Sequence, residues 1–217
     1  MPSDEDLPAG VTVVGTGRVG VAPDVVLLGL AAVVLAESVR SALDGASAAA
    51  TSVSAALRAT GVADRDLRTS GMRVEQAWQH GPEGAAPHGF EATVRVTARV
   101  RDVGSAGEVV AAAVEAGGDA VRVEQMTLSV DDPEAAQRAA RELAFEDARS
   151  KATHYAMLAD RRLAAVHSVV EHSAGGVAPF ESGWTEYAPL QHDARAAPIE
   201  EGDQDVRVGV TVRWSLA

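Results

Sequence analysis

Cysteine is absent from all 217 residues, so disulfides, thiolate nucleophiles and cysteine-ligated zinc are excluded. Lysine and arginine total 19 against 31 aspartates and glutamates, and the formal net charge of −12 excludes the positive surface that a general nucleic-acid binder needs. Long hydrophobic runs are absent too. The longest, residues 25–36, is far short of the roughly 20 residues that span a bilayer. The sequence therefore predicts no thiol chemistry, no nucleic-acid partner and no membrane span.

The start of the sequence lacks the features of a secretory signal. Residues 1–6 (MPSDED) are acidic, and no basic segment followed by an apolar core precedes Val11. We therefore expect residues 1–10 to form a flexible acidic tail and the protein to be cytoplasmic. Hydrophobic residues make up 47% of the chain, which is enough for a buried core, and residues 11–217 are expected to form a single domain.

The hydrophobic periodicity predicts seven strands and three helices in the order ββαββαβαββ. The strands are expected near residues 11–20, 25–35, 72–79, 90–101, 121–130, 165–171 and 206–216, and the helices near residues 38–60, 103–117 and 132–159. This order is typical of an α+β fold with mainly antiparallel sheets and helices packed on one face. The turn residues 22–24 (APD) predict that the first two strands form a hairpin.

Three local details accompany these elements. The apolar parity of the fifth strand changes between Val123 and Met126, which predicts a bulge near residues 124–125. Residues 173–203 contain glycines and prolines without periodicity, which predicts a long loop. The last helix is expected to bury a stripe of alanines together with larger side chains, namely Ala136, Ala139, Ala140, Leu143, Ala144, Ala148, Ala152, Tyr155 and Leu158.

Residues 15–20 (GTGRVG) match the G-x-G-x-x-G pattern of dinucleotide-binding loops. That chemistry requires a helix N-terminus at the end of the loop, where the backbone N–H groups hold the pyrophosphate. Here Pro23 and a second strand-like run follow instead. The pattern is therefore interpreted as a glycine-bearing strand, and no nucleotide or other cofactor is predicted.

Catalytic and metal-binding motifs are not evident. The six histidines show no HExxH spacing, and no GxSxG elbow is present. His80, His88 and His192 all lie in expected loops, where they are interpreted as surface residues, with convergence on one site as the alternative. The sequence therefore predicts no metal site and no enzymatic activity.

Four arginines occupy the polar face of two strongly alternating strands. Arg95 and Arg99 lie on one strand, and Arg207 and Arg213 on the other. One interpretation is a solvated sheet face that carries cross-strand ion pairs. The alternative is a subunit or ligand contact, because guanidinium groups on a flat sheet face suit an interface.

Several short stretches follow one another along the chain in a characteristic order. The stretches are residues 13–19 (VVGTGRV) leading to 22–24 (APD), 67–71 (LRTSG), 89–92 (GFEA), 100–102 (VRD), 117–121 (GGDAV), 144–152 (AFEDARSKA), and 198–202 (PIEEG) with 206–214. In order and spacing they resemble the SIMPL-domain family of bacteria, a domain of unknown function. The resemblance implies an α+β fold, large ring- or channel-like homo-oligomers, a link to oxidative-stress tolerance and an envelope location. It implies no catalytic residue.

Three hypotheses of function follow from these observations, of which the third, and the least favoured, is nucleotide binding through residues 15–20. The leading one is a non-enzymatic module that self-associates into a homo-oligomer and acts in binding or as a scaffold. The alternative is a small-molecule-binding protein or enzyme whose pocket lies under the loop at residues 173–203.

Overall fold

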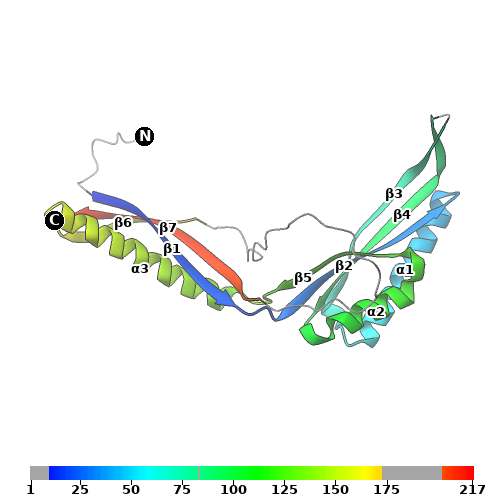
Figure 1. Ribbon diagram of the computed structural model, residues 1–217, viewed down its shortest axis with the longest axis horizontal. Helices are drawn as coiled ribbons and strands as arrows, with labels where there is room; N and C mark the ends of the chain where they lie inside the picture. Colours follow the sequence, from blue (N-terminus) through cyan, green and yellow to red (C-terminus); the bar gives the residue numbers. More distant parts are fainter. Residues whose placement is uncertain (1–9, 83, 173–201) are drawn as a thin grey trace. The chain divides into compact units, whose positions relative to one another are not determined.

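The computed structural model describes residues 10–82, 84–172 and 202–217 (Figure 1). These residues form two compact units. Unit 1 takes residues 10–23, 130–172 and 202–217, and unit 2 takes residues 24–129. The elements follow one another as β1 (Gly10–Val21), β2 (Val25–Ala36), α1 (Val39–Ala59), β3 (Leu67–Gly81), β4 (Gly84–Val100), α2 (Ala106–Gly117), β5 (Val121–Ser129), α3 (Glu134–Leu158), β6 (Leu163–His172) and β7 (Gln204–Leu216). The predicted order and the α+β class are confirmed.

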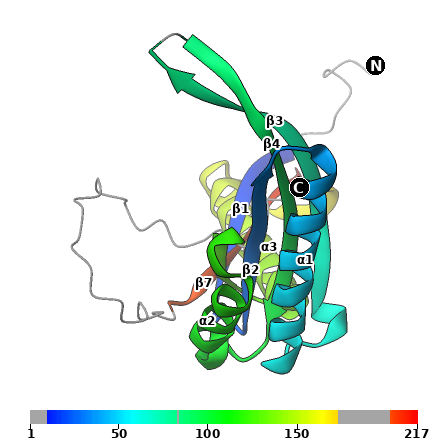
Figure 2. The same cartoon turned by 90° about the vertical axis from the view of Figure 1, so that its right-hand side faces the viewer.

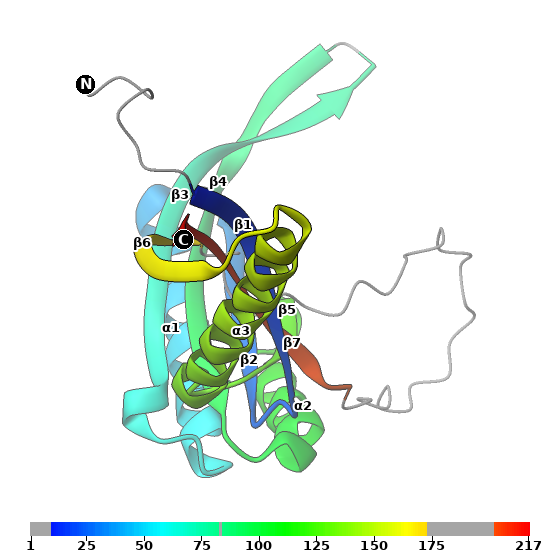
Figure 3. The same cartoon turned by 90° about the vertical axis from the view of Figure 1, so that its left-hand side faces the viewer.

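Unit 1 is a three-stranded antiparallel sheet in the order β1-β7-β6, with α3 against one face (Figure 3). The central strand β7 alternates strictly, and the side chains that it turns toward α3 are buried: Val206, Val208, Val210, Val212 and Trp214. The rings of Phe145 on α3 and Trp214 lie 5.9 Å apart in a tilted arrangement. This apolar layer between helix and sheet is the core of unit 1.

Helix α3 lies unusually close to β1 because both surfaces consist of small residues. The buried stripe of the helix is made of alanines four residues apart, Ala140, Ala144, Ala148, Ala152 and Ala156. Opposite them, a Cβ atom added to Gly15 would lie 2.0 Å from the carbonyl oxygen of Ala144, and one added to Gly17 would lie 1.9 Å from that of Ala140. The glycines of the G-x-G-x-x-G pattern therefore allow the helix backbone to approach the strand.

The predicted inner stripe of α3 is wrong in its larger members. Leu143, Tyr155 and Leu158 are 50%, 56% and 69% exposed. The gap between α3 and β1 has no room for a side chain beyond Cβ, so the helix is rotated to present only alanines, and Ala156 joins the stripe.

Unit 2 is a four-stranded antiparallel sheet in the order β3-β4-β2-β5 (Figure 2). Helices α1 and α2 cover one face, where Ala46, Val53, Leu57, Val109 and Ala113 pack against the sheet. The predicted alternation of β4 is confirmed, because every second residue from Ala92 to Val100 is buried. The helices thus lie on one face of each sheet, as expected from the sequence.

The bulge predicted in the fifth strand is confirmed. Gly29 of β2 pairs with Gln125, whereas the next residue, Leu30, pairs with Val123, so Glu124 is the additional residue in β5. A bulge turns its extra side chain out of the regular alternation. Glu124 is thereby free to reach across the open face of the sheet.

Two predictions about strand connections are wrong. The first two strands form no hairpin, because β1 pairs with β7 and β2 pairs with β4 and β5. The break expected at residues 81–89 is also absent, because β3 and β4 continue as a ribbon to the pair Gly81↔Gly84 (Figure 2). The expected tail and the expected loop lie outside the described residues, apart from Gly10, which begins β1, and residues 202–203. The single-domain assignment of residues 11–217 stays a prediction.

Candidate functional site

Each sheet has one face without a covering helix among the described residues, and the four predicted arginines lie on these open faces. Arg95 and Arg99 alternate with the buried residues of β4 in unit 2. Arg207 and Arg213 alternate with the buried residues of β7 in unit 1. The arginines therefore form two pairs that belong to separate units.

On the open face of unit 1, two arginines share one carboxylate. Arg18 and Arg207 are directly opposite each other in the β1–β7 ladder, an arrangement that is unfavourable for like charges. Asp205 lies between them: its Oδ1 accepts from Arg18 Nε at 2.5 Å and its Oδ2 from Arg207 Nη2 at 3.1 Å. The hydrogen bond from Arg18, and then that from Arg207, hold the pKa of Asp205 below its usual value. Asp205 and the two arginines thus form a cross-strand ion-pair cluster, as the first interpretation of the arginines expects.

A shallow pocket of about 460 Å³ adjoins this ion pair. It is lined by Thr16, Arg18, His172 and Arg207 and by the backbone around Gly209. The His172 Nε2 atom lies 2.5 Å from the hydroxyl oxygen of Thr211. Since its arginines and its histidine already have partners, this pocket offers few unpaired groups to a ligand.

In unit 2, Arg95 pairs with the bulged residue. Its Nε donates to both carboxylate oxygens of Glu124 at 3.0 Å. This ion pair joins β4 to β5 across β2 at the level of Ala31, which is only 1% exposed. The bulge therefore gives Arg95 a structural partner on the open face.

A second ion-pair cluster lies at the start of β3. Asp66 accepts from Arg101 Nε at 2.8 Å and from Arg101 Nη2 at 2.9 Å, a bidentate arrangement, and its side chain is 5% exposed. Arg65 lies 3.8 Å away. The hydrogen bond from Arg101 is the main cause that lowers the pKa of Asp66, and the charges of Arg65 and Arg99 act in the same direction. Burial opposes the shift but does not overcome it.

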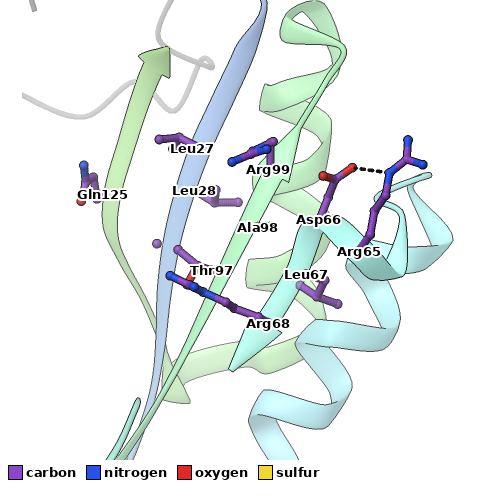
Figure 4. Close-up of a pocket in the computed structure, with 11 residues that line it drawn as sticks. Leu27, Leu28, Arg65, Asp66, Leu67, Arg68, Thr97, Ala98, Arg99 and Gln125 are labelled. Carbon is purple, nitrogen blue, oxygen red and sulfur yellow. Dashed lines mark ion pairs between the residues drawn. The ribbon is translucent and has the colours of Figure 1, made fainter. Parts of the chain in front are cut away.

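A pocket of about 390 Å³ opens beside this cluster on the same sheet face (Figure 4). Its floor is a row of paired residues that crosses all four strands, Arg68 on β3, Thr97 on β4, Gly29 on β2 and Gln125 on β5. Arg99 belongs to the neighbouring row, opposite Leu27. Because Gly29 has no side chain, the row is hollow at its centre.

Of the residues that line this pocket, only Arg99 is a predicted site residue. Arg68 and Thr97 were missed because neither stands out in its strand. One signal was available in Gly29, a single glycine inside the otherwise apolar second strand. Such glycines often mark a place where another group approaches the backbone closely.

The predicted histidines do not form a site that the structure shows. His80 and His88 lie on β3 and β4 of the ribbon rather than in loops, and His80 is paired with Ala85. His192 lies outside the described residues. Within residues 10–82, 84–172 and 202–217, no group of three histidines or carboxylates is placed to hold a metal ion.

Helix α3 packs against the glycine motif at residues 15–20. The backbone N–H of Thr16 donates to Asp147 at 2.8 Å, and Lys151 donates both to Asp147 at 2.7 Å and to the carbonyl oxygen of Val14 at 3.0 Å. The bonds from Lys151 and Thr16 lower the pKa of Asp147. Since the side of the helix, not its N-terminus, faces the glycines, this segment is not a phosphate-binding loop.

These features define an α+β protein of two antiparallel sheets, each with helices on one face and arginines on the other. None of the helices in the described ranges is long and apolar enough to cross a membrane. Residues 11–214 match the family model SIMPL, described as a protein of unknown function (DUF541), and the chain belongs to this family.

Two curated relatives carry the same name, "26 kDa periplasmic immunogenic protein". One is from Brucella melitensis biotype 1 and the other from Brucella abortus strain S19. Each is 27% identical to this chain over 219 residues, which cover 96% of this chain and 85% of the relative. The name places those two proteins in the periplasm and states no activity.

Proposed function

We propose that this chain is a non-enzymatic module that self-associates and acts in binding or as a scaffold. The observation that carries the proposal is the ribbon of β3 and β4. The last pair between β2 and β4 is Ala36↔Phe90, and beyond it β3 and β4 pair only with each other as far as Gly81↔Gly84. We refer to residues 76–81 and 84–89 as the ribbon.

An isolated two-stranded ribbon is marginally stable in water. This ribbon also exposes a large aromatic side chain, because Trp78 is 54% exposed. Aromatic residues of this kind often anchor protein interfaces, where they bury a large area at a small cost in side-chain entropy. Packing against a second copy would supply the apolar surface that the ribbon lacks.

Charge favours the ribbon as the place of contact. The protein has a net charge of −12, so two copies repel each other over most approaches. Residues 76–81 and 84–89 contain no Asp, Glu, Lys or Arg. Exposed strand edges are commonly protected from pairing by charged side chains, and this ribbon lacks that protection.

Native mass spectrometry and light scattering test the proposal on the full chain. The wild type is expected to form oligomers, and Trp78→Ser is expected to weaken the association by at least about tenfold. Tyr155→Ser is the matched control, because Tyr155 on α3 is 56% exposed and lies outside the ribbon. A wild type that stays strictly monomeric at millimolar concentration refutes the proposal. Equal weakening by both variants refutes the assignment to the ribbon.

The non-enzymatic part of the proposal rests on the titratable groups. A general acid works best with a pKa near the working pH, which for a carboxyl group requires an upward shift. In the part of the chain that the structure describes, three carboxyl groups have clearly shifted pKa values, namely Asp66, Asp147 and Asp205. Hydrogen bonds, above all from cationic partners, shift all three downward. The alternative of an enzyme or small-molecule binder with a pocket under residues 173–203 rests on a segment outside the described residues.

Location and stress tolerance also stay predictions. The expected location is the cytoplasm, whereas the name of the Brucella relatives favours the periplasm. Cell fractionation with an antibody against the chain distinguishes the two. A contribution to oxidative-stress tolerance would not use a thiol sensor, since the chain has no cysteine, but Met72 and Met157 are 57% and 62% exposed and open to oxidation.

A further inference from the structure

The open face of unit 2 brings several arginine side chains to one pocket. Three arginines line the pocket at Gly29, namely Arg65, Arg68 and Arg99, together with a single carboxylate, Asp66. That carboxylate is already bound in bidentate fashion by Arg101. On a protein of net charge −12, three arginines that line one pocket form a place where an anion can approach.

Arg68 is the group without a partner. Its guanidinium makes no ion pair or hydrogen bond with the described residues. Figure 4 shows its side chain lying across the sheet from β3 toward Thr97. A planar guanidinium with five N–H donors binds carboxylate or phosphate oxygens in pairs, and here those donors are available.

Thr97 supplies a second polar group without a partner. Its hydroxyl oxygen is buried and has no hydrogen-bond partner within residues 10–82, 84–172 and 202–217. Leaving a buried hydroxyl unpaired is unfavourable. Because Arg68 is directly opposite Thr97 in the ladder, a ligand that draws the flexible Arg68 side chain toward itself uncovers a hydroxyl able to donate to the same ligand.

The pocket has apolar walls as well. Leu27 lies on the same sheet face as Gly29 and lines the pocket, whereas Leu67 and Ala98 border it from the core beneath the helices. The volume of about 390 Å³ exceeds what an inorganic ion fills. We propose that this pocket binds a small organic oxyanion, a carboxylate or a phosphate monoester. Arg68 and Arg99 bind its charged end, the Thr97 hydroxyl donates to it, and its apolar part lies on Leu27 above Gly29.

Isothermal titration calorimetry of the full chain at low ionic strength tests the site, with phenyl phosphate, benzoate and inorganic phosphate as probes. We expect phenyl phosphate or benzoate to bind, and the tighter of the two assigns the anionic group. Inorganic phosphate is expected to bind more weakly, and binding as tight as that of phenyl phosphate overturns the apolar part of the site. No heat with any of the three probes at millimolar concentration overturns the proposal.

Two variants locate the binding. Arg68→Gln is expected to weaken it by at least about tenfold, since a charge-assisted hydrogen bond is lost. Arg40→Gln is the control, because Arg40 on α1 is exposed and its side chain likewise has no partner among the described residues. Equal affinities of the two variants contradict the assignment to Arg68.

Gly29→Val separates binding from folding. A Cβ at this position meets the Gln125 Cβ at 3.4 Å, an ordinary contact, and a β-branched residue suits a strand better than glycine. We therefore expect the variant to melt no lower than the wild type and to lose binding, because valine fills the floor. Undiminished affinity in a folded Gly29→Val variant overturns the proposal. None of these positions lies in the ribbon, so loss of this site leaves the proposed self-association standing.

Discussion

The close approach of α3 to β1 makes a sharp prediction for Gly17→Ala. The added Cβ would lie 1.9 Å from the carbonyl oxygen of Ala140 and 2.7 Å from the backbone nitrogen of Ala144. Both atoms belong to the helix backbone, so no side-chain rotation relieves the clash. The helix must withdraw from the strand by about 1.5 Å to restore ordinary contact distances.

The energetic cost follows from what that withdrawal loosens. Four fully buried alanine methyl groups face the sheet, namely those of Ala140, Ala144, Ala148 and Ala152, and each contributes about 0.8 kcal/mol. A gap of this size forfeits at least about half of the contact energy, and overpacking strain adds about 1–3 kcal/mol. After subtracting the benefit of replacing a strand glycine, about 0.5–1 kcal/mol, we expect a loss of about 2–4 kcal/mol in the free energy of unfolding.

Gly20→Ala on the same strand is the matched control. Its Cβ would meet nothing closer than Asp203 Oδ2 at 3.6 Å, so its stability is expected to stay equal or to rise slightly. Urea unfolding followed by circular dichroism measures both variants, and hydrogen exchange should show the loss of protection in β1, α3 and β7 rather than in unit 2. If Gly17→Ala and Gly20→Ala unfold at the same urea concentration, the close-packing argument is wrong.

Three further predictions concern ion pairs and packing in both units. Asp66→Asn is expected to lower the free energy of unfolding by about 1 kcal/mol at neutral pH. The pKa of Asp66 is lowered from 3.8 in the folded state, so the stability difference between wild type and variant is present above that pH and disappears as the pH falls through the folded pKa. Urea unfolding of both proteins at pH 7 and at pH 2 checks this. Lys151→Met should lower stability by about 1 kcal/mol, because bonds from α3 to β1 are lost, and an unchanged urea midpoint contradicts this. Ala144→Leu should cost more than about 3 kcal/mol, whereas Leu143→Ala should change stability by less than about 1 kcal/mol in the same assay.

Local signals predicted the elements of this fold well. Alternation identified β4 and β7, and the change of parity located the bulge at Glu124. These features depend on residues a few positions apart, which is the range over which a single sequence is informative. The partners of β1 and β2 were not predictable in this way, because the turn at residues 22–24 resembles a hairpin turn while the pairing is set by distant strands.

The errors in α3 and in the pocket have a common origin. The rotation of α3 depends on glycines more than 120 residues away, and hydrophobicity alone ranks Leu143 and Leu158 as more buried than alanine. In the pocket, Arg68, Thr97 and Gly29 come from three strands, and only their register makes them neighbours. The sequence predicted one of the arginines, Arg99, from its parity, but it could not predict which groups face it.

The order of the strands in unit 1 also bears on how the protein is made. Its sheet joins Gly10 to Ser215, whereas residues 24–129 of unit 2 form one uninterrupted segment between β1 and α3. On the ribosome, unit 2 can complete its sheet while β1 still waits for β7, the last strand to be synthesised. Sheet closure in unit 1 must wait for β7, so the newly made chain carries β1 without its partner strand for most of its synthesis. The inserted unit can thus fold first, and a stop before β7 leaves unit 1 without its central strand.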